Sequence, residues 1–355
     1  MVRVHGMDYQ ASGSFEVKWR DMKYFLIYAV AYFGDTLMTN ALCLNLKKTY
    51  PDCYIVYIVK QDFYDLVLHL QGVDEVWVYD KYGKHKGLSG IYSFIKKYKR
   101  KYDFDASFVT FSPLRGVLIS KILGAKQVFT EYNSFLCHPF ISNKKAEFKD
   151  YVHVQDRIAY LSELYSAQAM ESFKIRYDIP DEAQKFVDEK LLKNIEKPFI
   201  LLNPVTKNEI KDLRQNLVVE LVDLIEQNGY IPIMIGIGQS AEDYYKRLPE
   251  KTKNILQNFS NRTTIPQLAA LLKRAKLLIS ADTGTAHLAL ATDTPLVDVF
   301  YRNEEFRLKR WAPKSIYCAE SISNEKAFDV SYIWEKGKEL IARCGKKRNG
   351  DEWGI

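Results

Sequence analysis

The sequence predicts an α/β protein built from two doubly wound, Rossmann-like domains that face a central cleft. The chain has 355 residues, which is long for a single hydrophobic core. Apolar strand patterns alternate with helix patterns in two series of similar size. In the second series, a Gly- and Thr-containing turn within Ser280–Ala289 joins a strand to a helix. Such turns lie at the ligand-binding edge of open α/β sheets.

The first series lies in a predicted domain at residues 23–176, which follows an extension at residues 1–22. Its strands are short runs rich in β-branched and aromatic residues, and its helices carry apolar residues at helical spacing. The predicted strands are Tyr24–Val30, Tyr54–Val59, Glu75–Tyr79, Ala106–Phe111 and Gln127–Phe129. The predicted helices are Thr36–Tyr50, Phe63–Leu70, Leu88–Tyr98, Leu114–Leu123 and Val154–Tyr165.

The second series lies in a predicted domain at residues 177–330, and a helix with a basic tail follows at residues 331–355. Its predicted strands are Phe199–Leu202, Ile231–Ile235, Ile255–Leu256, Ala275–Ile279 and Thr294–Phe300. Its predicted helices are Asp181–Asn194, Gln215–Asn228, Ala241–Leu248, Ile265–Arg274, a short helix from about Ala286, and Tyr332–Ala342.

Composition indicates the class of protein and the charge of its binding partner. Hydrophobic residues make up 47% and charged residues 27%, which is typical of a globular protein rather than a disordered or membrane-spanning one. A net charge of +7 favours an anionic partner, either a nucleotide, a phosphorylated glycan or a membrane surface. We expect no nucleic-acid partner.

Cysteine and histidine usage indicates a reducing compartment and no metal centre. The five cysteines form no CxxC pair and the six histidines no HxxxH pair, so neither a disulfide framework nor a zinc site is expected. Residues 1–21 lack the apolar stretch of a signal peptide. We therefore expect a cytoplasmic protein without a metal cofactor.

The turn after the Ala275–Ile279 run is the strongest candidate ligand site. Gly284 and the following helix start can present N–H groups to a diphosphate, and Thr283 and Thr285 add hydroxyl donors. Asp282 would repel a phosphate, so it is better suited to sugar hydroxyls or to orienting the turn. The alternative is that Asp282 and Thr283 merely cap the helix. His287 by itself could equally be a core histidine.

Two further turns follow strands of the two domains. Gly34 permits a sharp turn after the first strand, and Asp35 could then act as a general base toward an acceptor hydroxyl. From spacing alone, an N-cap role for Asp35 is favoured. In the second domain, Thr206, Lys207 and Lys211 could contact phosphate oxygens, although a solvated basic loop is an equal alternative.

The remaining motifs are weaker. The sequence Gly236–Ala241 fits a loose phosphate-loop pattern, and Glu242 after it could bind a ribose. Asp103-Phe104-Asp105 has the form of a metal-binding DxD pair, but its alternation with apolar residues favours a solvated strand start. Arg115 could bind an anionic acceptor, and surface charge explains it equally well.

Several segments together resemble glycosyltransferase family 9, the heptosyltransferases of lipopolysaccharide core assembly. The segments are Tyr28–Thr39, Leu46–Asp52, Leu114–Ala125, Ile265–Leu272, Asp282–Leu288 and Trp311–Pro313, within about residues 23–315. The resemblance implies a GT-B fold with the acceptor site on the N-terminal domain and the nucleotide-sugar site on the C-terminal domain. It also implies inverting, metal-independent transfer.

Carried over to this chain, the resemblance implies that Asp35 is the base and Lys211 the cation at the diphosphate. The Asp282–Thr285 turn with His287 becomes the donor site. Asn203, the pair Asp212-Leu213 and the pair Ser112-Pro113 differ from the residues usual in the family. These departures leave the donor base, the donor sugar and the acceptor open.

The expected activity is transfer of a heptose from ADP-heptose to a phosphorylated, Kdo-containing core acceptor. This anionic glycolipid implies peripheral contact with the cytoplasmic face of an inner membrane. One alternative is a related transferase that uses another nucleotide-sugar or a capsule acceptor. A second is a protein that binds a nucleotide-sugar without transferring it.

Overall fold

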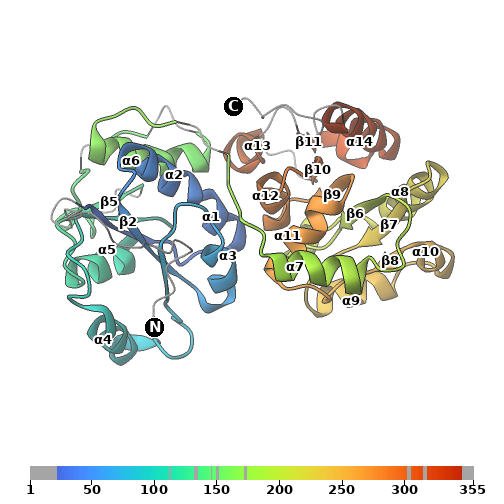
Figure 1. The fold of residues 1–355 in the computed structure, drawn as a ribbon. Helices are drawn as coiled ribbons and strands as arrows, with labels where there is room; N and C mark the ends of the chain where they lie inside the picture. Colours follow the sequence, from blue (N-terminus) through green and yellow to red (C-terminus); the bar gives the residue numbers. More distant parts are fainter. Residues whose placement is uncertain are drawn as a thin grey trace, which may run out of the picture.

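The computed structural model describes residues 22–111, 113–131, 135–144, 146–148, 152–171, 174–301, 305–314 and 318–345. Two α/β units lie side by side, the first blue to green and the second yellow to red (Figure 1). One apolar cluster, which includes Phe25 in the first unit and Leu278 in the second, continues through both of them. The two units are therefore joined by hydrophobic packing as well as by the chain.

The first unit is built on a parallel sheet, which has five strands in the described part of the chain, in the order β3-β2-β1-β4-β5. Nearly every residue of its inner strands is buried, which is why they read as continuous apolar runs. The strands are β1 (Tyr24–Tyr28), β2 (Tyr54–Val59), β3 (Glu75–Val78), β4 (Ala106–Val109) and β5 (Gln127–Thr130).

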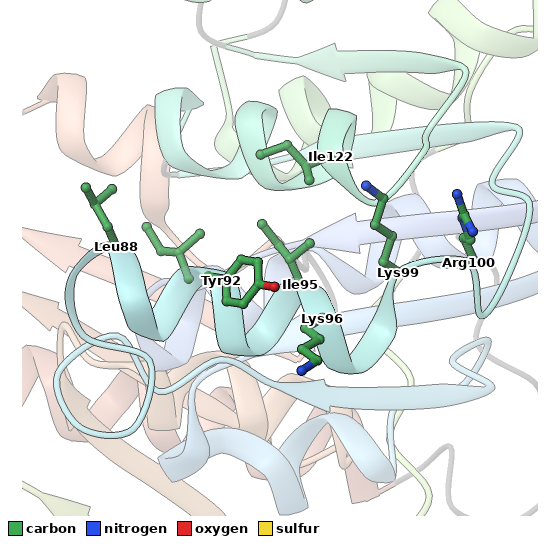
Figure 2. Close-up of a pocket in the computed structure, with 8 residues that line it drawn as sticks. Leu88, Tyr92, Ile95, Lys96, Lys99, Arg100 and Ile122 are labelled. Atoms are coloured by element: carbon green, nitrogen blue, oxygen red, sulfur yellow. The ribbon is translucent and has the colours of Figure 1, made fainter.

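Helices cover both faces of this sheet. Residues of α2 (Asn40–Thr49) and α6 (Val154–Ser166) share a core with one face, together with α1 (Phe33–Met38) and α3 (Tyr64–Leu68), which follows η1 (Gln61–Phe63). On the other face, α4 (Gly87–Tyr98) and α5 (Pro113–Ile122) lie alongside each other (Figure 2).

The second unit has a parallel sheet in the order β11-β10-β9-β6-β7-β8, six strands among the residues described. They are β6 (Phe199–Asn203), β7 (Ile231–Met234), β8 (Gln257–Asn258), β9 (Leu277–Ala281), β10 (Leu296–Phe300) and β11 (Ala319–Ser323). The connecting elements are α7 (Asp181–Phe186), η2 (Val187–Leu191), η3 (Glu209–Lys211), α8 (Gln215–Gln227), α9 (Gln239–Lys246), α10 (Glu250–Ile255), α11 (Ile265–Arg274), α12 (Gly284–Ala291), α13 (Glu305–Trp311), η4 (Asn324–Phe328) and α14 (Val330–Gly345).

Strand order reverses between β1 and β4 in the first sheet and between β6 and β9 in the second. At such a point the loops leave in opposite directions and open a crevice beyond the carboxyl ends of the strands. The segments after β1, β6 and β9 carry most of the predicted site residues, and Arg115 and Glu242 follow β4 and β7. The predicted doubly wound α/β class is confirmed.

Several predicted elements differ from the observed ones. The single helix predicted at Thr36–Tyr50 is divided into α1 and α2, because the hydroxyl of Thr39 donates to the carbonyl of Asp35 (2.9 Å) and perturbs the helix there. The helix predicted at Asp181–Asn194 ends in a π-helical turn at Leu191. No prediction covered α10, α13 or β11. The last is an edge strand in which only two residues are buried, so its apolar signal is weak.

The C-terminal helix α14 packs against β9, β10 and α8 of the second unit. Residues 1–21 and 346–355 lie outside the described residues, and so does the predicted basic tail beyond Gly345. The predicted boundaries after residues 22, 176 and 330 stay predictions. No helix within the described ranges is long and apolar enough to cross a membrane.

Candidate active site

The N-terminal turns of α1 and α12 touch, and this contact brings the two main candidate motifs together. A methyl group added at Gly284 would lie 2.2 Å from Cδ1 of Phe33 and 2.9 Å from the backbone nitrogen of Gly34. A methyl group at Gly34 would lie 3.2 Å from Cδ2 of His287. The Gly34-Asp35 turn of the first unit and the Asp282–His287 segment of the second are therefore in contact.

Asp35 is the third residue of α1 rather than its N-cap, but its carboxylate still contributes to capping the helix. Tyr32 occupies the N-cap, and its backbone N–H donates to Oδ2 of Asp35 (3.2 Å). Burial raises the pKa of Asp35 to about 6, although the Tyr32 N–H and the charge of Lys60 act in the opposite direction. A carboxyl group with a pKa near this value is mostly ionised at neutral pH and is suited to accept a proton.

The turn after β9 is held by side chains from two strands. Asn203 at the end of β6 lies opposite Ser280 in the sheet register. The Asn203 amide donates to the Thr283 hydroxyl (2.9 Å) and to the Ser280 hydroxyl (3.3 Å). Thr283 is the N-cap of α12, and its hydroxyl is held by Asn203 and Ser280 rather than by a cap bond. The first-turn N–H groups of α12 have no intrahelical acceptor and can face a ligand.

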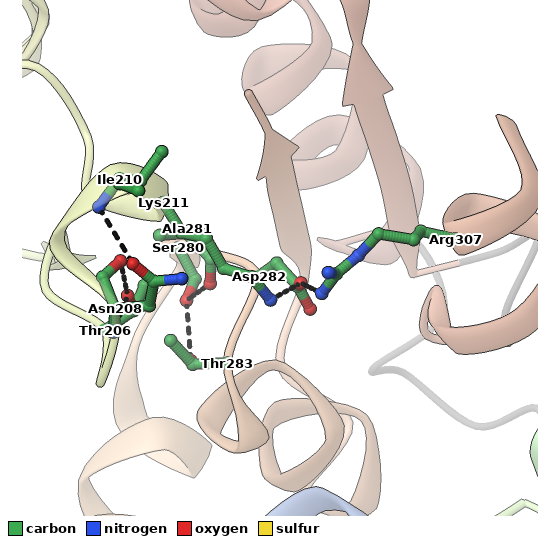
Figure 3. A network of polar contacts seen from close by, with 9 residues as sticks. All are labelled: Thr206, Asn208, Ile210, Lys211, Ser280, Ala281, Asp282, Thr283 and Arg307. Atoms are coloured by element: carbon green, nitrogen blue, oxygen red, sulfur yellow. Dashed lines mark hydrogen bonds and ion pairs between the residues drawn. The ribbon is translucent and has the colours of Figure 1, made fainter. Parts of the chain in front are cut away.

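Two cations converge on one carboxylate beside this turn (Figure 3). Oδ2 of Asp282 accepts from Nζ of Lys211 (2.7 Å) and from a guanidinium nitrogen of Arg307 (3.0 Å). Lys211 comes from η3 and Arg307 from α13, so three loops meet here. Two cationic side chains at the end of β9 are of the type that contacts a diphosphate.

A second aspartate lies buried behind this cluster. Asp298 on β10 is opposite Ser280 in the register, and neither of its carboxyl oxygens has a hydrogen-bond partner. Burial raises its pKa well above the ordinary value, and the neighbouring charge of Asp282 acts in the same direction.

The loop after β6 reaches the first unit. Nζ of Lys207 lies 5.2 Å from the ring centre of Tyr32, and Nζ of Lys60 lies 4.7 Å from the same ring. Tyr32 is 64% exposed; Lys207 is also exposed, and Lys60 is half-buried. Thr206 instead stabilises its own loop, since its N–H donates to Asp212 (2.7 Å) and its hydroxyl to the Asn208 carbonyl (2.7 Å).

His287 is buried against Gly34 and is not a cationic ligand at neutral pH. Its pKa is lowered to about 4, chiefly by burial and secondarily by the neighbouring His153. His153 lies at the start of α6 and its Nε2 is 2.9 Å from the carbonyl oxygen of Ala312, which follows α13. These histidines therefore join the two units.

Glu131, which directly follows β5, was missed by sequence reasoning. Its Oε1 is buried without a partner, and its Oε2 lies 3.6 Å from Nε of Arg157. Burial raises its pKa to about 7, against the charges of Arg157 and Arg310, and the charge of Asp35 raises it further. A second buried carboxyl group is therefore electrostatically coupled to Asp35. A lone glutamate after a strand gives no sequence signal for this position.

Other candidates lie apart from the turn after β9. Glu242 is in α9, which follows β7, two strands from β9, and it accepts from the Asn261 amide (2.9 Å). Arg115 is exposed in the first turn of α5, and its charge acts on Tyr28 and Tyr79. Asp105 accepts from the N–H of Tyr24 at the opposite, amino-terminal edge of the sheet (3.0 Å), which fits the expected strand start.

The described residues contain no cluster of three or more His, Cys, Asp or Glu side chains arranged to hold a metal ion. All five cysteines are buried and outside disulfides.

Two doubly wound units that meet at the Gly34-Asp35 turn and the start of α12 have the architecture of the GT-B fold. A family model described as glycosyltransferase family 9 (heptosyltransferase) matches residues 95–336. The chain belongs to glycosyltransferase family 9, and it is a glycosyltransferase.

Individual relatives are distant but similar in length. The chain is 22% identical to the lipopolysaccharide core heptosyltransferase OpsX of Haemophilus influenzae over 281 residues, which are 78% of this chain and 79% of the relative. The family 9 glycosyltransferase structure from Veillonella parvula superposes on this structure with a TM-score of 0.79 at 17% sequence identity. The superposition covers 90% of this chain and 97% of the Veillonella chain. The Escherichia coli heptosyltransferase WaaC with ADP-2-deoxy-2-fluoro heptose gives a TM-score of 0.70 at 17% identity, with 89% and 99% covered. The two structures confirm the predicted GT-B fold.

Proposed function

We propose that the protein transfers a heptose from ADP-heptose to a lipopolysaccharide core acceptor that contains Kdo or heptose. We further propose that the transfer inverts the anomeric centre and needs no metal ion. The names of the relatives support the heptose and the core acceptor. The ADP-2-deoxy-2-fluoro heptose bound by the similar WaaC protein supports the donor.

The contact between the Asp35 turn and the α12 turn carries this proposal. In the proposed step, the acceptor hydroxyl gives its proton to Asp35 while its oxygen forms a bond to the anomeric carbon. The bond from that carbon to the diphosphate oxygen breaks, and its electron pair leaves with the diphosphate. One displacement of this kind inverts the anomeric centre. General-base assistance of this type is worth about 10²–10⁴ in rate.

The departing diphosphate needs positive charge, which Lys211 and Arg307 would supply beside Asp282. The first turn of α12, with Thr283, Gly284 and Thr285, would supply hydrogen-bond donors. These protein groups support metal-independent transfer, because they take the role that a divalent cation would otherwise have. The experimental check is that transfer persists in EDTA.

The other predicted roles form part of the same proposal. Glu242 would bind the ribose, and Thr206 and Lys207 would order and border the donor loop. Gly34 would border the acceptor through its backbone, with His287 packed against it. Arg115 would bind an anionic group of the acceptor at the same sheet edge. The anionic glycolipid would be met at the cytoplasmic face of the inner membrane.

The test is transfer by the purified protein from ADP-heptose to a Kdo-containing lipid A acceptor, followed by mass spectrometry of the product. Asp35→Asn should lower transfer at least 100-fold and leave ADP binding within about twofold. Unchanged transfer by this variant would remove Asp35 from the mechanism. Proton NMR of the product at the new anomeric centre reports inversion or retention.

A melting-temperature screen with ADP-, GDP- and UDP-sugars separates the alternatives. A ligand at 100 times its dissociation constant adds about 2.7 kcal/mol of stability, so the correct donor gives a clear shift. A shift with a GDP- or UDP-sugar alone would favour a transferase with another donor. A shift with ADP-heptose but no transfer to any core acceptor would favour a non-catalytic binding protein.

A further inference from the structure

Positive charge is concentrated in one segment of the first unit. Residues 81–101 contain eight Lys and Arg residues and no Asp or Glu. The net charge of the whole chain is +7, so +7 less +8 leaves −1 for all other residues. The segment covers the loop after β3, helix α4 and the turn after it. The basic character of this protein is therefore a local property of the α4 region.

The same region exposes apolar side chains. Leu88 at the start of α4 is 87% exposed and Tyr92, one turn later, is 66% exposed. On the neighbouring α5, Leu114, Leu118 and Ile122 recur every fourth residue and are 39%, 37% and 45% exposed. This spacing places the three side chains on one face of α5. Two adjacent helices thus expose rows of apolar side chains to solvent.

A groove of about 540 Å³ lies between these helices. Its apolar lining includes Leu88, Ile95 and Ile122. Lys99 and Arg100 stand at one end of the groove, and Lys96 extends from α4 on the side away from α5 (Figure 2). Leu88 and Ile95 point from α4 toward α5, with Ile122 across the groove. Apolar residues flanked by lysine and arginine match a membrane interface, where acyl chains meet anionic headgroups.

Two other occupants fit this surface less well. A second copy of the chain would bring two strongly basic segments together, which is unfavourable. Single-stranded nucleic acid is bound by platforms of several aromatic side chains. The exposed apolar residues of α4 and α5 include one aromatic, Tyr92, and four aliphatic residues, Leu88, Leu114, Leu118 and Ile122. An anionic membrane matches both features, because its headgroups attract the basic residues and its acyl chains accept the exposed apolar side chains.

One end of the surface, the start of α5, lies at the same edge of the sheet as the candidate active site. Helix α5 begins at the carboxyl end of β4, the edge of the sheet from which the Asp35 turn also leaves. Arg115, in the first turn of α5, is next to Leu114 at the start of the apolar stripe. An acceptor carried by a lipid could therefore reach the site while its acyl chains stay in the bilayer.

We propose that the α4–α5 surface docks this protein on a membrane rich in anionic phospholipid. The inference deepens the proposed function, since it assigns the surface that meets a lipid-borne acceptor. Binding requires neither donor nor acceptor, so it can be tested separately from transfer.

The first experiment is co-sedimentation of the full chain with phosphatidylcholine vesicles, with and without phosphatidylglycerol, at low salt. We expect strong binding only with phosphatidylglycerol. The triple variant Lys96→Gln/Lys99→Gln/Arg100→Gln should lower the partition coefficient about 100-fold, since three surface charges are removed. The matched control is Lys190→Gln/Lys193→Gln/Lys197→Gln on the second unit. All three of these lysines are exposed, so the control removes the same number of surface charges. The control should bind like the wild type.

The second experiment tests the apolar contribution. Leu88→Ser/Leu118→Ser should bind at least tenfold more weakly at high salt, where screening removes most of the electrostatic part. Melting temperatures of all variants establish that they are folded. Unchanged activity on a water-soluble acceptor fragment would separate docking from catalysis.

Three results would overturn the proposal. The first is equal binding by the triple variant and its control. The second is binding to single-stranded RNA as tight as to the vesicles and unaffected by Leu88→Ser/Leu118→Ser, which would assign the surface to nucleic acid. The third is a dimer in sedimentation velocity that the same apolar variant dissociates, which would assign it to a second copy.

Discussion

Gly34 and His287 are in contact across the junction of the two units, so close that a methyl group added to Gly34 would lie 3.2 Å from Cδ2 of the imidazole. Each of the two residues lies next to the groups that are proposed to act in its unit. Gly34 precedes the candidate base Asp35, and His287 lies in the first turns of α12 after the candidate diphosphate-binding groups. The absence of a side chain at Gly34 lets these two turns approach.

The close approach predicts graded effects of added methyl groups. Gly284→Ala would place Cβ 2.2 Å from Cδ1 of Phe33, whereas Gly34→Ala meets its nearest atom at 3.2 Å. We expect Gly284→Ala to lower kcat/KM at least tenfold and Gly34→Ala to have a smaller effect, because overpacking costs about 1–3 kcal/mol. Steady-state transfer kinetics measure both.

A double-mutant cycle isolates the contact. Alanine is favoured over glycine within a helix by about 1 kcal/mol, so Gly284→Ala need not destabilise α12 itself. Adding Phe33→Ala removes the ring that the new methyl group would meet and should restore part of the lost transfer. Strictly additive losses in the double variant would show that the contact does not control activity.

The raised pKa of Asp35 predicts the acid limb of the pH–rate profile. Burial raises this pKa to about 6, so kcat/KM should fall tenfold for each pH unit below that value as the base becomes protonated. The charge of Lys60 lowers the pKa of Asp35, so Lys60→Gln should move the limb to higher pH. A limb that stays in place in Lys60→Gln would indicate that another group is titrating.

The same shift predicts a stability effect. The pKa of Asp35 rises from the ordinary 3.8 to about 6 on folding, so the folded state binds this proton more tightly. The free energy of unfolding therefore falls as the pH rises from 3.8 through 6, by about 3 kcal/mol in total. Asp35→Asn removes this penalty and should be more stable than the wild type at about pH 7.5.

Urea unfolding at several pH values provides the measurement. The advantage of Asp35→Asn should shrink as the pH is lowered toward 3.8, where the wild-type carboxyl group is increasingly protonated in both states. A pH-independent difference between the two proteins would point to packing rather than charge.

Lys211 is expected to act on the diphosphate. Removing it leaves Asp282 paired with Arg307 and takes one positive charge from the cluster. Hydrogen bonds to charged groups are worth about 1.5–3 kcal/mol, so Lys211→Ala should weaken ADP binding by roughly 10- to 100-fold. Titration calorimetry with ADP measures this loss. Lys193→Ala, at an exposed lysine outside the proposed site, is the matched control, and an equal loss there would mean that only overall charge matters.

Much of the fold was predictable from the sequence. Strand β2 and helix α11 were predicted with their observed bounds, Tyr54–Val59 and Ile265–Arg274. A buried parallel strand must be apolar along its whole length, and α11 carries a Thr264 capping box in addition to its apolar face. The elements that were missed, such as α13 and β11, lie late in the second unit, where these local patterns are weak.

The candidate site was only partly predictable. The turns that contain Asp35 and Thr283 carry local patterns, a Gly with a polar residue after an apolar strand. Asn203, Arg307 and Glu131 carry none. Asn203 reaches Thr283 because β6 and β9 are neighbours in the sheet, and Arg307 reaches Asp282 from a helix that follows the next strand. Their positions depend on strand order and register, which short-range patterns do not encode.

The sequence by itself determined two parallel α/β units and the turns that follow their strands, because hydrophobic periodicity and glycine placement act over a few residues. Only the tertiary structure decided that α1 meets α12, that Lys211 and Arg307 share Asp282, and that Asp35 is buried enough to raise its pKa. Those properties come from contacts between residues far apart in the chain. The free energy of such contacts depends on distance and desolvation in the folded molecule, which the order of residues does not display.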